Sequence, residues 1–162
     1  IMILRPFSKS DGNMILSWIN DEREFYVLTG GTLGNYPITS EDIYNAYTSR
    51  RDLMVFIAEE NNKSIGQFGL YVTEGKNYRI CYVIVNKKER GKGLGTEMVR
   101  EAVKYCFDVL EGESISLSVF KTNKPAFLCY KKIGFKIIDG KEKSFNIMGK
   151  EEACYEMILK RY

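Results

Sequence analysis

The sequence predicts an α/β (α+β) fold in which a mixed, mostly antiparallel central sheet of about seven strands carries about four helices on its faces. Three apolar segments joined by short turns, at 53–58, 64–72 and 78–85, indicate an antiparallel meander. After the meander, apolar residues between 94 and 110 recur at helical spacing and indicate a long amphipathic helix. No linker, repeat or second core interrupts the pattern, so we expect residues 1–162 to form a single domain.

The N-terminal part predicts a short strand and two helices before the meander. Residues 2–5 are expected to form the strand. Apolar residues on one helical face then predict a helix, and they are Met14, Ile15, Trp18 and Ile19. The segment 25–37 contains three glycines and is expected to be irregular. Thr39 and Asp42 form a capping-box pattern that opens a short helix over 41–50.

The C-terminal part predicts three further strands and one further helix. Residues 114–119 have the apolar character of a strand. Asn123 is a suitable N-cap for a helix that runs to Ile133 and ends at Gly134 in a left-handed cap. The closing strands are expected at 135–138 and 153–159. The charged segment between them, 139–152, is expected to be a mobile hairpin loop.

Composition excludes several classes of function. The chain contains no His, which excludes Ser-His and Cys-His nucleophilic sites and zinc-protease motifs. The four cysteines form no C-x-x-C pair, so we expect free thiols and no metal site; they are Cys81, Cys106, Cys129 and Cys154. A net charge of +3 is too small to favour a nucleic-acid partner. No apolar run approaches the ~20 residues of a membrane helix, and no signal-peptide pattern occurs, so we expect a cytoplasmic chain with no membrane partner.

A glycine-rich segment between an apolar strand and the amphipathic helix carries the strongest functional signal. Residues 90–95 read Arg-Gly-Lys-Gly-Leu-Gly, and the helix begins within them. Backbone N–H groups at a helix N-terminus lack internal partners and attract anions, and glycines let a phosphate approach the main chain. The segment therefore predicts a diphosphate site.

Two common phosphate-binding motifs do not match this segment. A P-loop would need Gly where Asn86 stands and a Ser or Thr where Gly93 stands. In a dinucleotide fingerprint the third glycine would come one residue later, and the segment would not follow a meander.

The pattern that does match is Arg/Gln-x-x-Gly-x-Gly/Ala, followed by Asn123 and by a Tyr-x-x-x-Gly-Phe motif at 130–135. With these residues the sequence resembles the GNAT superfamily of acetyl-coenzyme A-dependent N-acetyltransferases. The resemblance is strong over 53–138 and follows the order of elements elsewhere. Residues 18–22 are similar to the branch that contains ribosomal-protein N-terminal and spermidine acetyltransferases.

The resemblance implies a GNAT-like form of the predicted sheet and a role for each motif. In the family, the third and fourth strands of the sheet splay apart around a bulge and leave a V-shaped opening. Here Val83, Ile84 and Val85 would pair with the pantetheine arm of acetyl-CoA, the cosubstrate, and a free N–H would polarise the thioester carbonyl. The pyrophosphate would be held by Arg90, Gly91, Lys92, Gly93, Leu94, Gly95 and Thr96. Asn123 would hydrogen-bond the arm, and Tyr130 would lie near the sulfur as the catalytic residue.

Structural roles stand beside several of these functional ones. Lys87 and Lys88 are either solvated or bind the 3′-phosphate of the cofactor. Asn123 could serve only as a helix cap, and Tyr130 could be a core tyrosine. Three aromatic residues either line a substrate pocket or simply pack, and they are Phe25, Tyr26 and Tyr36.

The general base and the acceptor stay open at this point. Many family members carry a Glu at the position that Ile80 occupies here. Candidates that could act at a distance are Glu22, Glu24 and Glu74. Acidic residues at 21–24 hint at a cationic acceptor, such as a polyamine, an aminoglycoside or a peptide N-terminus. The sequence does not decide between a monomer and a homodimer.

The resemblance implies an N-acetyltransferase that acts on the primary amine of a small molecule or peptide by direct attack in a ternary complex. The alternative is a non-catalytic sensor of the same fold that binds an acyl-CoA, and its only support is the missing Glu. A basic nucleic-acid-binding module is a third class, which the small net charge disfavours.

Overall fold

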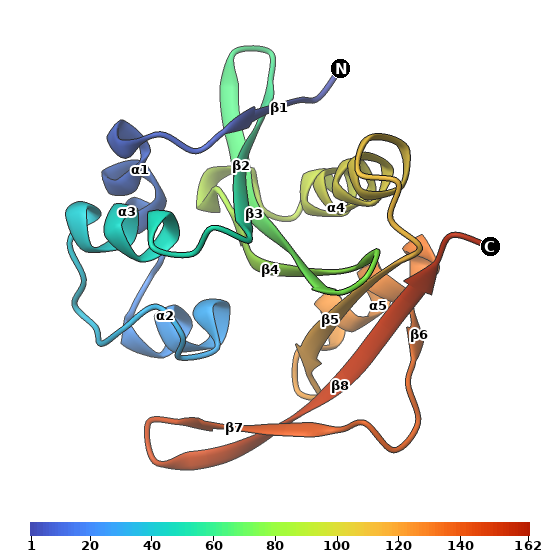
Figure 1. The fold of residues 1–162 in the computed structure, drawn as a ribbon. Coiled ribbons are helices and arrows are strands. Elements are labelled where there is room, and N and C mark those ends of the chain that lie inside the picture. The colour runs from blue at the N-terminus through green and yellow to red at the C-terminus, as the bar shows by residue number, and fades with distance from the viewer.

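An eight-stranded sheet runs through the computed structural model, which describes residues 1–162 (Figure 1). Its strand order is β1-β2-β3-β4-β5-β8-β6, and β7 pairs with β8 off this path. The strands are β1 (Ile3–Pro6), β2 (Leu53–Glu60), β3 (Lys63–Glu74), β4 (Asn77–Val85), β5 (Ser114–Phe120), β6 (Lys136–Ile137), β7 (Lys143–Ile147) and β8 (Lys150–Lys160). Every pairing is antiparallel except that of β4 with β5. The mixed, mostly antiparallel sheet predicted from the sequence is confirmed.

Helices cover both faces of this sheet (Figure 1). They are α1 (Gly12–Ser17), α2 (Glu22–Thr29), α3 (Ser40–Thr48), α4 (Leu94–Lys104) and α5 (Lys124–Ile133). A π-helical turn, Tyr105–Val109, extends α4. The α4 face packs on the largest apolar cluster, which includes Phe68, Leu70 and Met98. The opposite face packs against α1, α2 and α3 through two smaller clusters.

A bulge in β4 changes which face of the sheet its side chains occupy. Gln67 pairs with Ile84 and Gly69 pairs with Cys81, so two residues of β4 lie opposite the single residue between them on β3. Tyr82, one of the two, has a left-handed φ of 50°. Ile80 therefore packs in the α4 cluster, whereas Ile84 packs in the cluster on the opposite face.

The sheet opens along the edge of β4 that faces β5, opposite the edge that pairs with β3. The parallel pairing of β4 with β5 joins only Asn77–Arg79 to Ser114–Ser116. Beyond that point the rest of β4 has no ladder partner on β5, and the two strands diverge (Figure 1). The prediction that the third and fourth strands splay apart is therefore wrong by one strand. Because β3 and β4 resume their pairing after the bulge, the V-shaped opening lies between β4 and β5.

Two segments that were expected to be irregular form regular structure. Part of 25–37 belongs to α2, whose N-cap Asp21 accepts a hydrogen bond from the N–H of Glu24 at 2.8 Å. The expected mobile loop at 139–152 contains β7, which pairs with β8 along its whole length. The structure therefore has one strand and one helix more than the sequence predicted.

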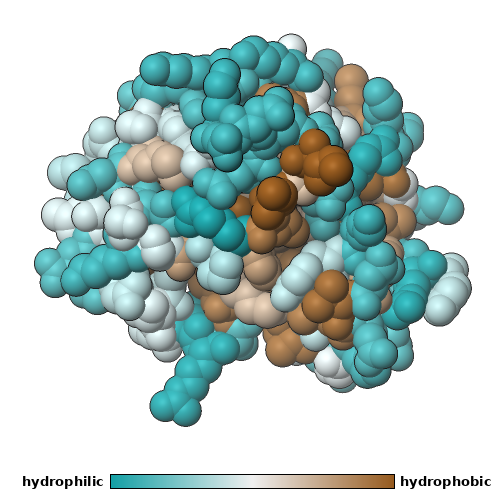
Figure 2. All heavy atoms as spheres, turned by 90° about the horizontal axis from the view of Figure 1, so that it is seen from above, coloured by the Kyte–Doolittle hydropathy of each residue, from teal (hydrophilic) through white to brown (hydrophobic).

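The surface is largely hydrophilic on the face seen from above, with apolar side chains gathered near its centre (Figure 2). None of the helices combines the length and the apolar character needed to cross a bilayer.

Candidate active site

A cavity of about 840 Å³ passes through the opening between β4 and β5. Because the bulge and the opening expose both faces of the sheet, the cavity has two halves. The α4 half is lined by Ile80, Val83, Val85, Gly91, Gly93, Gly95, Thr96, Val99, Leu117, Val119, Asn123, Pro125, Ala126, Cys129 and Tyr130. The α2 half is lined by Val27, Leu28, Thr29, Gly30, Thr32, Arg50, Tyr71, Arg79, Cys81, Tyr82, Ser118, Phe120, Lys143, Phe145 and Cys154. Glu24 and Arg90 complete the lining.

The N-terminus of α4 forms an open cradle of backbone groups in the α4 half. Gly93 is the N-cap with φ 80°, and no side chain caps the helix. The first intrahelical bond runs from the N–H of Glu97 to the Gly93 carbonyl, at 3.1 Å. The N–H groups of the residues between them have no internal partner, as at any helix start. The positive end of the helix dipole adds to the attraction for an anion.

Glycines are required at two positions of this cradle for different reasons. The left-handed φ of Gly93 strains any side chain placed there, although nothing lies within 4 Å of the added Cβ. A Cβ on Gly95 would come within 3.1 Å of Val85 Cγ2, so this glycine allows α4 to approach β4 closely.

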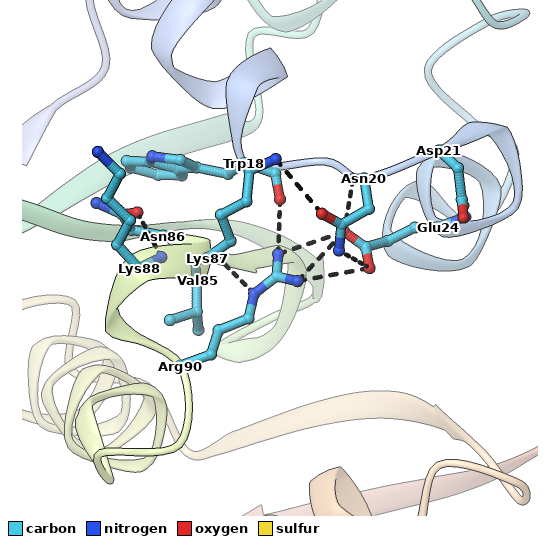
Figure 3. A network of polar contacts seen from close by, with 9 residues as sticks. All are labelled: Trp18, Asn20, Asp21, Glu24, Val85, Asn86, Lys87, Lys88 and Arg90. Atoms are coloured by element: carbon cyan, nitrogen blue, oxygen red, sulfur yellow. Dashed lines mark hydrogen bonds and ion pairs between the residues drawn. The ribbon is translucent and has the colours of Figure 1, made fainter.

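The Arg90 side chain lines the cavity. It is anchored by Trp18, Glu24 and Val85 (Figure 3). Its guanidinium donates to the Trp18 carbonyl at 2.7 Å and to the Val85 carbonyl at 3.0 Å, and it pairs with Glu24 at 3.3 Å. Glu24 also accepts a hydrogen bond from the backbone N–H of Asn20, at 3.0 Å. These contacts tie the α1–α2 connection to the start of the glycine segment. The guanidinium is therefore engaged by protein groups, and the main chain that follows it is the part that faces the cavity.

The lysines near the cradle point to other partners or to solvent. Lys92 pairs with Glu89 at 2.9 Å, and Lys87 lies 3.4 Å from the side-chain oxygen of Asn20. Neither of these lysines lines the cavity, and neither does Lys88.

Asn123 and Tyr130 are brought together with the cradle by α5. Asn123 caps this helix through a 3.2 Å hydrogen bond from the N–H of Ala126 to its side-chain oxygen, while its side-chain NH₂ makes no hydrogen bond within the chain. Tyr130 is partly buried, packs edge-on against Phe135 at 5.9 Å between ring centroids, and makes no hydrogen bond through its hydroxyl. Burial raises the pKa of Tyr130 well above its usual value, which keeps the phenol protonated.

The strand residues expected beside this site divide between the two faces. Val83 and Val85 line the α4 half, whereas Ile84 is 1% exposed and packs against α1 on the other face. Leu94 and Lys92, within the glycine segment, also lie outside the cavity lining.

A buried glutamine that lies outside every sequence motif supports the bulge. Gln67 is fully buried, and its NH₂ donates to the Tyr82 carbonyl at 3.3 Å and to the Tyr47 hydroxyl at 2.9 Å. Its side-chain oxygen has no partner. The Tyr82 hydroxyl is 2.7 Å from that of Thr32, on the segment after α2. The bulge is thus held from both sides. A lone Gln within an apolar strand was the only sequence signal for this role.

A charged network closes the floor of the α2 half. Arg79 pairs with the buried Glu156 at 3.0 Å, and Lys143 reaches the same carboxylate at 3.2 Å. Ser118 donates to Glu156 and accepts from Arg79. Glu156 does not line the cavity, so the two cations and the serine separate it from the cavity.

Three of the thiols border the cavity. Burial raises the pKa of Cys81 to about 12 and that of Cys154 to about 12, so both stay protonated at neutral pH. Cys129 lies 2.9 Å from the Thr96 hydroxyl, which joins α5 to the first turn of α4. All four cysteines are free, as the sequence predicted.

The aromatic and acidic candidates from the α2 region have structural roles. Phe25 is fully buried, and neither it nor Tyr26 nor Tyr36 lines the cavity. Of the three candidate bases, Glu24 alone lines the cavity, and it is paired with Arg90. Ile80 occupies the cavity wall at the position of the expected Glu.

Comparisons with known proteins show which family and which folds the chain is similar to. The sequence profile of the acetyltransferase (GNAT) family matches residues 14–135. Over 149 residues the chain is 28% identical to aminoglycoside N(6')-acetyltransferase type 1 of Klebsiella pneumoniae, which covers 82% of this chain and 73% of that protein. It is 25% identical over 151 residues to an N-acetyltransferase 9-like protein of Caenorhabditis briggsae, covering 83% of this chain and 74% of that protein. The fold is similar to that of spermidine N-acetyltransferase from Vibrio cholerae in complex with CoA and spermine, with a TM-score of 0.84, 19% identity, and coverage of 99% and 95%.

Proposed function

The chain belongs to the acetyltransferase (GNAT) family, and on that basis we propose that it transfers the acetyl group of acetyl-CoA to a primary amine by direct attack in a ternary complex. The observation that carries the proposal is the cavity through the sheet, which joins the glycine cradle on one face to a second chamber on the other. A donor and an acceptor could enter from opposite faces and meet at the opening.

The residues present fit acetyl-CoA in the α4 half. Gly91, Gly93 and Gly95 leave the main chain open at the helix N-terminus, where a pyrophosphate would be held by backbone N–H groups. The unpaired edge of β4 offers backbone partners to an extended arm, and the free NH₂ of Asn123 offers another. When bound, acetyl-CoA supplies the acetyl thioester.

Proton movement sets the chemical demands on the site. An alkyl ammonium has a pKa of ~10.4, so only about one amine in a thousand is neutral and nucleophilic at pH 7. The cavity wall provides no unpaired carboxylate, because Glu24 is bound by Arg90 and Ile80 replaces the expected Glu. We infer that the acceptor loses its proton to solvent water in the cavity. As the N–C bond forms and the C–S bond breaks, the nitrogen gives up its other excess proton to solvent water. A second proton is delivered to the departing sulfur by a group of the site, which then regains a proton from water.

Tyr130 is the residue that provides the proton for the sulfur. Tyr130 lines the α4 half, its hydroxyl makes no hydrogen bond within the chain, and its raised pKa keeps the proton on the oxygen. A thiol has a pKa of ~8.5 and an ordinary phenol ~10, so a full transfer to a thiolate is uphill by about 2 kcal/mol for an ordinary phenol, and burial of Tyr130 raises this cost further. Tyr130 therefore acts as a hydrogen-bond donor that protonates sulfur as the bond breaks.

An assay of coenzyme A release with a panel of primary amines tests the proposal. We expect thiol release that depends on both acetyl-CoA and one class of amine. Binding of acetyl-CoA without thiol release for any amine would instead support the alternative of a non-catalytic acyl-CoA sensor, which the Ile80 position favours. The cytoplasmic location stays a prediction.

A further inference from the structure

The α2 half is lined by basic and aromatic side chains, which do not suit a substrate that carries several positive charges. Three of its lining side chains are basic, namely Arg50, Arg79 and Lys143, and none is acidic. A polyamine or an aminoglycoside carries several ammonium groups, which need carboxylates close by to replace their hydration. Glu24 is the one acidic residue of the whole lining, and Arg90 neutralises it.

The acidic residues near the chamber are already matched by basic ones. Glu156 lies behind Arg79 and Lys143 and pairs with both, so one carboxylate faces two cations. Asp52 pairs with Arg50 at 3.2 Å but does not line the cavity. Arg50, Arg79 and Lys143 carry three positive charges, and they face two carboxylates, Asp52 and Glu156. The chamber therefore has one positive charge without a matching carboxylate.

Arg50 is the cation best placed to bind a ligand directly, and the surplus positive charge of Arg79 and Lys143 adds to the attraction for an anion. Its guanidinium stacks over the Tyr71 ring, with its central carbon 4.6 Å from the ring centroid. One nitrogen of the guanidinium contacts Asp52, and the guanidinium also reaches the Tyr82 hydroxyl, where it opposes the rise that burial causes in the pKa of Tyr82. Stacking fixes the plane of the guanidinium and leaves donors free, which is the arrangement that binds a carboxylate with two parallel hydrogen bonds. Tyr71 and Arg50 both line the cavity.

Apolar and aromatic side chains form the remaining walls of the chamber. Val27 and Leu28 come from α2, while Phe120 and Phe145 pack edge-on against each other at 5.9 Å between centroids. Such walls favour an uncharged, apolar substituent on the acceptor.

We propose that the acceptor is a primary amine that also carries a carboxylate, namely an α-amino acid with an apolar side chain, whose carboxylate is bound by Arg50. This inference rests on the proposed acetyl transfer and names the substrate class of the same site. The amine would reach the opening between β4 and β5, while the apolar side chain lies against the aromatic walls.

Matched pairs of acceptors isolate the carboxylate. Initial rates of coenzyme A release should be measured with L-leucine and L-phenylalanine, with their primary amides, and with spermidine and kanamycin. We expect kcat/KM for each free amino acid to exceed that of its amide by roughly tenfold or more, since a charge-assisted bidentate contact is lost in the amide. Equal or higher activity with the amides, or with spermidine or kanamycin, would overturn the inference.

Variants of Arg50 then test the assigned residue. Arg50→Gln should raise KM for leucine by roughly tenfold with little change for leucinamide, and Arg50→Lys should recover part of the loss. Arg51→Gln is the matched control, because Arg51 is exposed and lies outside the cavity. Equal effects of Arg50→Gln on leucine and leucinamide would indicate a structural role and reject the assignment.

Different results would reject the substrate class and the acetyl transfer. Transfer to spermidine or kanamycin without transfer to amino acids rejects the substrate class and keeps the acetyltransferase. Absence of thiol release with every amine of the panel rejects the acetyl transfer itself, and the inference with it.

Discussion

At the residue scale, the hydrogen bonds distinguish side chains that are engaged within the protein from side chains whose polar groups are free for a ligand. Arg90 begins the glycine motif, yet its guanidinium is occupied by Glu24, Trp18 and Val85. The Tyr130 hydroxyl and the side-chain NH₂ of Asn123 are free of partners within the chain and border the cavity. We therefore assign the chemistry to the free groups and the support of the cradle to Arg90.

Replacing Tyr130 by Phe tests its role as a proton donor. Removing the hydroxyl takes away the group that we propose protonates sulfur, but it leaves the ring and its packing on Phe135. We expect kcat to fall roughly tenfold or more, with the affinity for acetyl-CoA nearly unchanged. Steady-state kinetics and calorimetry measure the two effects separately. Tyr105→Phe is the control, since Tyr105 lies outside the cavity, and a Tyr130→Phe enzyme with normal turnover would remove the assignment.

Replacing Gly93 by Asp tests the cradle. The substitution forces a side chain into a left-handed conformation and places negative charge beside the site of the pyrophosphate. We expect the Kd for coenzyme A to rise by roughly tenfold or more. Gly75→Asp is the matched control, because Gly75 also has a positive φ of 59° and open space, but lies in the β3–β4 turn away from the cavity. Similar calorimetric affinities for the two variants would contradict the assignment.

At the scale of the elements, the bulge of β4 depends on one buried side chain. Gln67→Leu removes the donor to the Tyr82 carbonyl and leaves the buried Tyr47 hydroxyl without its partner. We expect the free energy of unfolding to fall by about 1–3 kcal/mol and kcat/KM to fall as well. Urea denaturation and kinetics give the two values, and an unchanged unfolding midpoint would show that Gln67 does not hold the bulge.

The junction of β1 with α1 predicts a dependence of stability on pH. Asp11 accepts two hydrogen bonds of 2.8 Å from Arg5 and one from the N–H of Ser8, and these contacts hold its pKa below the usual range. A carboxyl whose pKa is lowered by folding stabilises the protein fully above its unfolded pKa of ~3.9 and loses that contribution as pH falls through the folded value. We expect Asp11→Asn to lower stability at neutral pH and to flatten its fall in acid. Thermal midpoints between pH 7 and 3 measure this, and parallel curves for both proteins would refute it.

The elements with a long or repeated apolar pattern could be predicted from the sequence, whereas α2 and β7 could not. The meander of β2, β3 and β4 and the helix α4 follow from strong apolar periodicity. α2 has eight residues and few repeats of its pattern, although Asp21 and Gly30 are its caps. β7 alternates weakly, and it is held by pairing with β8 rather than by its own composition.

At the scale of the whole molecule, the site depends on contacts that sequence spacing does not contain. The cradle and the motif around Tyr130 were predictable, because each lies within one short segment. The α2 half was not, because Arg50, Tyr71 and Lys143 come from three distant elements. A one-residue bulge in β4 also changes the face on which later side chains lie, and that placed Ile84 away from the cavity.

The acidic residues of the α2 region show the same limit. The charges at 21–24 suggested a cationic acceptor, but the structure uses Asp21 as a helix cap and Glu24 as the partner of Arg90. The charge of the chamber comes instead from residues that no local pattern connects. Specificity is therefore a property of the folded molecule.

A crystal structure of the chain with coenzyme A is the most direct test of the account. We expect both phosphorus atoms of the pyrophosphate to lie beside the backbone N–H groups of residues 91–96, with the pantetheine arm leading along the unpaired edge of β4 towards Tyr130. A pyrophosphate bound elsewhere on the protein, with the start of α4 left empty, would contradict it.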